Sequence, residues 1–130
     1  MKRFVIPGLT MLAGFAIGAV AIPGLHAQAK PPTYVVIAIR KINDADSFKE
    51  IVPKYPALVA AAGGHYVART AADGQITALD GTPPQRFIMA QFESPEKALA
   101  WHNSPGIKEL DAIRLKSTDS LSFIVEGVSQ

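Results

Sequence analysis

The stretch RFIMAQFESPEKALAWHNSP, residues 86–105, decides the fold, because it combines a strand with the starts of two helices. In a strand, successive side chains point to opposite faces. Residues 86–92 therefore split into two sets, with Ile88, Ala90 and Phe92 on one face and Phe87, Met89 and Gln91 on the other. Both sets are largely apolar, so we expect each face of this strand to be covered.

Two Ser-Pro pairs predict that two helices follow one another directly after this strand. Ser94 can accept a hydrogen bond from the first turn, and Pro95 suits the first helical position because it has no amide hydrogen. The second pair begins at Ser104. The apolar residues that we expect to face the sheet from the two helices are Ala98, Leu99, Trp101, Ile107, Leu110 and Ile113.

Residues 1–29 predict an export signal that is cleaved from the mature protein. Lys2 and Arg3 precede an apolar run over residues 4–22, and Ala27-Gln28-Ala29 is a small-residue cleavage pattern that allows cleavage after Ala29 or Ala27. A retained membrane anchor is the alternative, but prolines and glycines interrupt the run, which falls short of about 20 strongly apolar residues. We therefore expect a periplasmic or secreted protein with no stable membrane anchor after cleavage.

Charge and cysteine content exclude several classes of function. The chain has 13 basic and 11 acidic residues, and Lys2 and Arg3 leave with the signal, so the mature domain is formally neutral. A neutral domain offers no basic patch for nucleic acid. The chain has no cysteine, which excludes disulfides, thiol nucleophiles and thiolate metal sites. Only two histidines lie outside the signal, so we predict no metal site and no cofactor.

The remaining chain predicts a single domain over residues 34–128, after a short linker at residues 30–33. A helix over residues 43–62 contains Pro53 and Pro56, so we expect it to kink or restart there. Asp73-Gly74 and Asp80-Gly81 bracket a short strand or hairpin arm at 75–79. The other predicted strands are 34–40, 65–69, 86–92 and 121–125.

The predicted order is strand, helix, two strands, helix pair and strand. This is the β-α-β-β-α-β order of the ferredoxin-like α+β fold, a four-stranded antiparallel sheet with its helices on one face. The other face of the sheet stays apolar, and an exposed apolar patch on a small domain indicates a partner. We expect that partner to be a second copy of the chain, which would form a homodimer.

Several motifs in this order resemble a known family. They are Gly63-Gly64-His65-Tyr66-Val67-Ala68-Arg69, Leu79-Asp80-Gly81 with Pro84 and Arg86, Gln91-Phe92-Glu93-Ser94, Ala98 with Ala100-Trp101, Ser104-Pro105, Arg114 and Val125-Glu126-Gly127. Together they resemble domain-of-unknown-function family 1330, over residues 34–128. The resemblance implies a dimeric α/β barrel, in which the open sheets of two ferredoxin-like protomers face each other. The chain departs from the family pattern at His102, where an aromatic hydroxyl is common.

The candidate ligand-binding residues are those that we expect to line a small, mostly apolar cavity between sheet and helices. Arg69 would be its polar anchor, and the lining would come from Tyr34 or Tyr66, with Phe87, Met89 and Trp101. His65, Val67 and Arg69 are expected to share one strand face. The alternative is that Arg69 forms a structural salt bridge, with Asp80 or Glu126, and that His65 lies at the rim of the domain.

His65 and His102 are the candidate catalytic residues, since histidine is the most common general acid or base. The alternative for His102 is a surface position near the end of a helix, where a cation is favourable. Three functions remain open: binding of a small organic ligand, a cofactor-free monooxygenase or isomerase activity, and a structural or protein-interaction dimer with no ligand.

Overall fold

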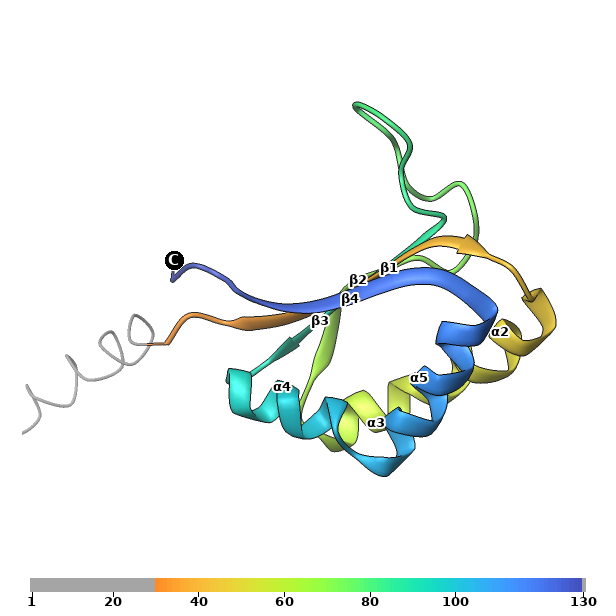
Figure 1. The fold of residues 1–130 in the computed structure, drawn as a ribbon. Coiled ribbons are helices and arrows are strands. Elements are labelled where there is room, and N and C mark those ends of the chain that lie inside the picture. The colour runs from red at the N-terminus through yellow and green to blue at the C-terminus, as the bar shows by residue number, and fades with distance from the viewer. Residues whose placement is uncertain (1–29, 130) are drawn as a thin grey trace, which may run out of the picture. The chain divides into compact units, whose positions relative to one another are not determined.

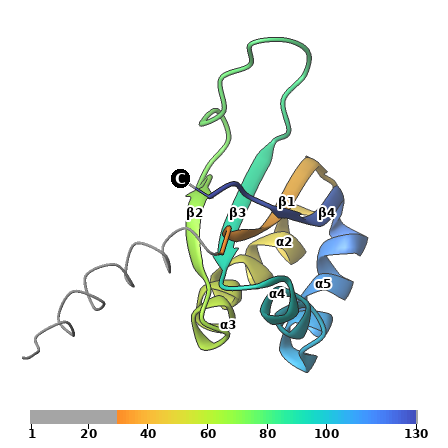
Figure 2. The same cartoon turned by 90° about the vertical axis from the view of Figure 1, so that its left-hand side faces the viewer.

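The computed structural model describes residues 30–129 of the chain and confirms the predicted ferredoxin-like α+β fold. Its strands form one antiparallel sheet in the order β2-β3-β1-β4. The helices all lie on one face of this sheet (Figures 1 and 2). The elements are β1 (Thr33–Ile42), α2 (Ala45–Ile51), a 3₁₀ turn (Val52–Lys54), α3 (Tyr55–Ala61), β2 (His65–Arg69), β3 (Arg86–Phe92), α4 (Pro95–His102), α5 (Pro105–Ser117) and β4 (Thr118–Glu126). The predicted export signal lies outside the described residues.

The hydrophobic core fills the space between the sheet and the helices. The central strand β1 contributes Val35, Ile37 and Ile39, and the register places Val35 beside Ala90 of β3 and Ile124 of β4. The core side chains of the helices are Phe48, Ile51, Val59, Ala98, Trp101, Ile107 and Leu110. Full burial of one such aliphatic side chain contributes about 1.5–3 kcal/mol. On the helix side, this core therefore covers one of the two apolar faces that the sequence predicts for the strands.

The first helical segment restarts at its prolines, as predicted. Asp44 begins α2 by accepting a hydrogen bond from the Ser47 amide at 3.2 Å, and its bond with the Ser47 hydroxyl holds the pKa of Asp44 below its usual value. The 3₁₀ turn then carries Pro53, and α3 begins anew at Tyr55. Proline lacks the amide that would continue the α-helical bonding, which explains the break.

The two Ser-Pro pairs begin α4 and α5, but they differ in capping. Ser94 Oγ accepts a hydrogen bond from the Lys97 amide at 3.2 Å. Ser104 Oγ instead donates to the Trp101 carbonyl oxygen at 2.7 Å.

The predicted apolar faces of α4 and α5 need correction. Leu99 of α4 is exposed, since the buried residues of that helix are Ala98 and Trp101. Ile113 of α5 is exposed, because the buried stripe of α5 continues from Leu110 to two polar residues, Asp111 and Arg114.

Residues 70–85 form a loop that extends beyond the sheet between β2 and β3 (Figures 1 and 2). The predicted strand at 75–79 was wrong: these residues have no partner strand in the described chain. The loop is held at its base, where Asp73 accepts hydrogen bonds from Arg86 at 2.9 Å and from Gln85 at 3.2 Å. Gln75 also accepts bonds from the Ala71 and Ala72 amides. Side-chain hydrogen bonds and turns therefore hold this loop, in place of the backbone hydrogen bonds of paired strands.

No helix within residues 30–129 covers the other face of the sheet (Figure 1). This face carries Val36 at its centre and three exposed apolar residues of β4: Leu121, Phe123 and Val125. No helix in the described part of the chain is long and apolar enough to cross a membrane.

Candidate functional site

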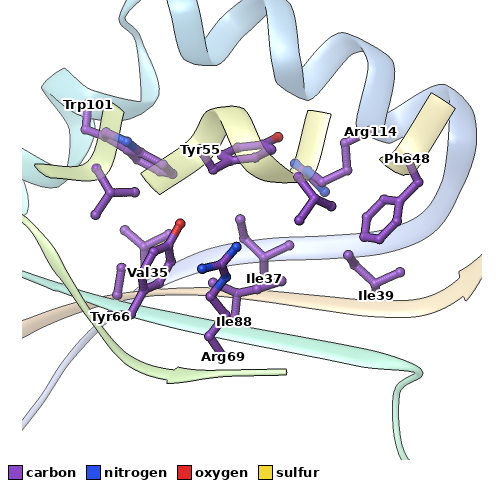
Figure 3. Close-up of a pocket in the computed structure, with 13 residues that line it drawn as sticks. Val35, Ile37, Ile39, Phe48, Tyr55, Tyr66, Arg69, Ile88, Trp101 and Arg114 are labelled. Carbon is purple, nitrogen blue, oxygen red and sulfur yellow. The ribbon is translucent and has the colours of Figure 1, made fainter. Parts of the chain in front are cut away.

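A small pocket of about 50 Å³ lies between the sheet and the helices. Its wall is mostly apolar, and Figure 3 shows side chains from both layers facing this space. The aliphatic and aromatic lining residues are Val35, Ile37, Ile39, Phe48, Val52, Tyr55, Val59, Tyr66, Ile88, Ala90 and Trp101. Two arginines complete the wall, Arg69 from β2 and Arg114 from α5. We call this space the first pocket.

Arg114 is a buried cation in the wall of the first pocket, with 3% of its surface exposed. It lies on the buried stripe of α5, one turn after Leu110. Its Nη1 donates to Ser120 Oγ at 2.6 Å, and its Nε donates to Asp111 Oδ1 at 3.4 Å. These bonds leave Nη2 without a hydrogen-bond partner among residues 30–129. The guanidinium is thus fixed by the protein and still has donor capacity.

Asp111 connects three elements through its two carboxylate oxygens. Oδ1 accepts from the Tyr55 hydroxyl at 2.8 Å as well as from Arg114. Oδ2 lies 3.7 Å from Nδ1 of His102, the last residue of α4. Burial raises the pKa of Tyr55 well above its usual value, and the negative charge of Asp111 raises it further. Tyr55 therefore stays a neutral hydrogen-bond donor to the carboxylate.

Arg69 and Tyr66 form the β2 side of the first pocket (Figure 3). The Arg69 guanidinium lies 4.9 Å from the centre of the Tyr66 ring, a cation–π distance. Burial raises the pKa of the Tyr66 hydroxyl, and the charge of Arg69 partly offsets this rise. The alternative salt bridge of Arg69 is not seen: within residues 30–129 it has no ion pair with Asp80 or Glu126.

A bulge in β2 corrects the predicted face of this strand. Residues His65, Val67 and Arg69 would alternate onto one face of a regular strand. The register instead shifts between Tyr66 and Ala68, so Arg69 pairs with Ile88, which packs against the core, and lies on the helix side. His65 pairs with Gln91 and lies on the opposite face. One inserted residue thus separates the two groups that were expected together.

A second pocket of about 200 Å³ lies beside β4 and shares part of its wall with the first. The shared residues are Val35, Ile37 and Trp101. The other lining residues are His102, Asp111, Ser122, Phe123 and Ile124. Trp101 is 5% exposed, packs against Phe92 with ring centres 5.4 Å apart, and has a buried Nε1 with no hydrogen-bond partner in the described chain.

The predicted site residues fall into three groups. Tyr66, Arg69 and Trp101 line the first pocket as expected. Phe87 and Met89 were wrongly placed in that wall, and Tyr34, the alternative to Tyr66, does not line it either. Strand alternation puts these side chains on the opposite face of the sheet. The two histidines line different spaces. His102 lines the second pocket, and His65 lines a shallow hollow of about 410 Å³ with Gln91 and Lys97.

Sequence reasoning missed Tyr55, Asp111 and Arg114 as site residues. The available signal was spacing, because Asp111 and Arg114 continue the helical stripe of Ile107 and Leu110. Among the described residues, no group of three or more His, Asp or Glu side chains could hold a metal ion.

Comparison with known proteins gives the fold and the family. No curated protein matches the chain. A protein of unknown function from Rhodopseudomonas palustris is 11% identical, with 85% of this chain and 94% of that chain covered and a TM-score of 0.60. A dimeric ferredoxin-like protein of unknown function from Thermobifida fusca is 15% identical (75% and 92% covered, TM-score 0.54). SnoaB, a cofactor-independent oxygenase from Streptomyces nogalater, is 14% identical (75% and 92%, TM-score 0.51).

These similarities show the fold alone. The family described as "Domain of unknown function (DUF1330)" matches residues 32–128, which is nearly the whole of the described chain. The protein belongs to this family.

Proposed function

We propose that this protein is an exported homodimer that binds a small organic molecule with an acidic oxygen in the first pocket. The observation that carries the proposal is the buried Arg114, which is fixed by Asp111 and Ser120 and keeps Nη2 free of partners in the described chain. An arginine with remaining donors in an apolar wall is suited to a carboxylate or an enol oxygen.

The charge of the pocket favours an anion. Asp111 compensates the charge of Arg114, since the two side chains are 3.4 Å apart. Arg69 has no acidic partner within residues 30–129 and lines the same pocket. The first pocket therefore carries one uncompensated positive charge. A small organic acid would supply the opposite charge for Arg69 at the edge of the pocket.

The size of the pocket limits what can enter it. Its volume of about 50 Å³ is smaller than the roughly 150 Å³ of an enclosed cavity that holds benzene. We therefore expect the acidic head group and few carbon atoms to lie inside. The rest of the ligand would extend past Arg69, which is an exposed side chain at the edge of the pocket.

The open sheet face supports the homodimer. Leu121, Phe123 and Val125 occupy alternate positions of β4 and expose 37–46% of their surface, and Val36 lies beside them. Apolar residues gathered on one face are typical of an interface. A second copy placed sheet to sheet would bury about 800 Å² per protomer at ordinary size. The Thermobifida fusca protein with this fold is itself dimeric.

Export is the remaining part of the proposal. The basic start, the apolar run and the Ala27-Gln28-Ala29 pattern support a cleaved signal in residues 1–29. Cleavage there would release the domain into the periplasm or the medium.

Native mass spectrometry of the protein purified from the periplasm tests the proposal. We expect a dimer of mature chains that carries extra mass, and we expect Arg69→Ala to lose that mass while it stays dimeric. Arg40→Ala is the matched control, because Arg40 is an exposed arginine that pairs with Asp119 at 3.1 Å outside the pocket. Equal retention by the Arg69 variant would remove Arg69 from the site, and a dimer without extra mass would favour a structural role.

A further inference from the structure

His102 lies close to a carboxylate that could orient its ring. It ends α4, and its Nδ1 lies 3.7 Å from Asp111 Oδ2. Asp111 is itself held in place, because its other oxygen accepts from Tyr55 and Arg114. The His102 side chain is 43% exposed and lines the second pocket, so solvent and a small molecule can both reach it.

We propose that His102 is a catalytic base and acid in the second pocket and that Asp111 is its positioning residue. A carboxylate facing Nδ1 favours the tautomer with the proton on Nδ1, which leaves the lone pair of Nε2 available. Separations between such groups are often long without substrate and shorten when it binds. This inference goes beyond ligand binding in the first pocket and does not require that pocket to be occupied.

A second, independent feature is the indole of Trp101, which lines both pockets. Its Nε1 is buried and has no hydrogen-bond partner in residues 30–129. Leaving such a donor unpaired costs about 1–3 kcal/mol, so buried polar groups of this kind need an explanation. Trp101 lines the second pocket beside His102. A substrate oxygen that accepted from Nε1 would remove this cost and would be stabilised as it gained negative charge.

The base and the donor together suit one class of reaction, the isomerisation of a small carbonyl compound through its enol. His102 Nε2 would take a proton from the carbon next to the carbonyl, and the electrons of that C–H bond would form a carbon–carbon double bond. The carbonyl electron pair would move to oxygen, which would accept a hydrogen bond from Trp101. The imidazolium would then return the proton to the oxygen or to carbon. The reaction needs no oxidant and no other reactant.

The wall of the second pocket indicates an apolar substrate. Val35, Ile37 and Ile124 contribute aliphatic surface, while the polar lining residues are His102, Asp111 and Ser122. The volume of about 200 Å³ is larger than that of the first pocket. A carbonyl compound with one small aromatic or aliphatic group fits this combination of size and polarity.

Deuterium exchange tests the proposal with two probes, phenylpyruvate and the neutral ketone phenylacetone. In deuterated buffer, the loss of the benzylic proton signal by NMR measures proton abstraction from carbon. We expect the full mature protein to accelerate this loss with at least one probe. His102→Ala should lower the rate above background by about 100-fold or more, and added imidazole should restore part of it.

Two further variants separate the roles of the residues. His65→Ala is the matched control, because His65 is the other histidine of the described chain and lies on the opposite sheet face; its exchange rate should be unchanged. Asp111→Asn should lower kcat and leave KM unchanged, as expected for a residue that acts through His102.

Three results would overturn the proposal: no acceleration with either probe, full activity in His102→Ala, or no response of this variant to imidazole. Arg69→Ala separates this proposal from the proposed ligand binding in the first pocket. The variant should lose ligand binding but keep the deuterium exchange that depends on His102, and this exchange should be present even if the first pocket binds nothing.

Discussion

Three polar residues of the helical layer, Tyr55, Asp111 and Arg114, form a hydrogen-bonded network inside the domain. A buried carboxylate is costly unless it is paired, and here one oxygen accepts from a hydroxyl and a guanidinium. The network explains why charged residues occupy core-facing positions of α5. It also fixes Arg114 and Asp111 at the walls of the two pockets.

Tyr55→Phe should lower the free energy of unfolding at neutral pH. It should also reduce the decrease of this free energy at alkaline pH. The substitution removes the 2.8 Å bond to Asp111, which we expect to cost about 1.5 kcal/mol. The pKa of Tyr55 is raised in the folded protein, so its stabilisation is complete below the unfolded pKa of about 10 and decreases above it. The difference between the two proteins should therefore narrow above about pH 10.

Urea unfolding from about pH 7 to about pH 11 measures this difference. Tyr34→Phe is the control, because Tyr34 lies on the other face of the sheet, away from the network. A constant difference between wild type and Tyr55→Phe across this range would show that Tyr55 does not titrate as described.

At the scale of elements, local irregularities decide which side chains reach the pockets. The bulge in β2 moves Arg69 to the helix side, and the turn before β2 depends on two glycines with different roles. Gly63 has a φ of +81° and closes α3. Gly64 has an ordinary φ, but a Cβ there would lie 2.7 Å from the buried Phe92 ring.

Gly64→Ala should destabilise the protein by about 1–3 kcal/mol through this clash. Gly63→Ala should cost about 1 kcal/mol for a different reason, the left-handed backbone. Phe92→Leu provides the test, because it removes the ring atoms that the new Cβ would meet. In a double-mutant cycle by urea unfolding, Phe92→Leu should reduce the cost of Gly64→Ala and leave that of Gly63→Ala unchanged. Equal behaviour of the two alanine variants would contradict the assignment.

At the scale of the whole molecule, the domain covers one face of its sheet and leaves the other apolar. The helices bury Val35, Ile37 and Ile39, while the residues of β1 between them face away from the helices. A sheet with two apolar faces and one helical layer leaves an apolar face exposed, which is the basis of the proposed dimer.

Phe123→Asp should turn the proposed dimer into a folded monomer. Phe123 is 46% exposed and lies beside Val36 at the centre of the open face, where a buried carboxylate would have no partner. Leu115→Asp is the matched control, because Leu115 is 60% exposed on α5, outside the sheet. Light scattering gives the mass, and circular dichroism gives the fold. A Phe123 variant that stays dimeric would exclude the sheet-to-sheet interface.

The sequence by itself determined the order of strands and helices, the restart at Pro53, the Ser94 cap and the apolar open face. These features depend on local signals, such as alternation in strands, serine at helix starts, and proline at helix starts and breaks. For the site, sequence reasoning named Arg69, Tyr66 and Trp101, which all line the first pocket, although Arg69 reaches it only through the bulge in β2.

Only the tertiary structure decided which residues meet across the domain. Tyr55 and Asp111 are 56 residues apart in the chain, and the bulge that redirects Arg69 exists only in the pairing of β2 with β3. Aspartate usually lies at the surface. Burial of Asp111 becomes favourable only because Tyr55, Arg114 and His102 lie next to its carboxylate. Which polar groups pair depends on the residues that are close in space, and the sequence alone does not show these. For this reason Asp111 was missed as a site residue.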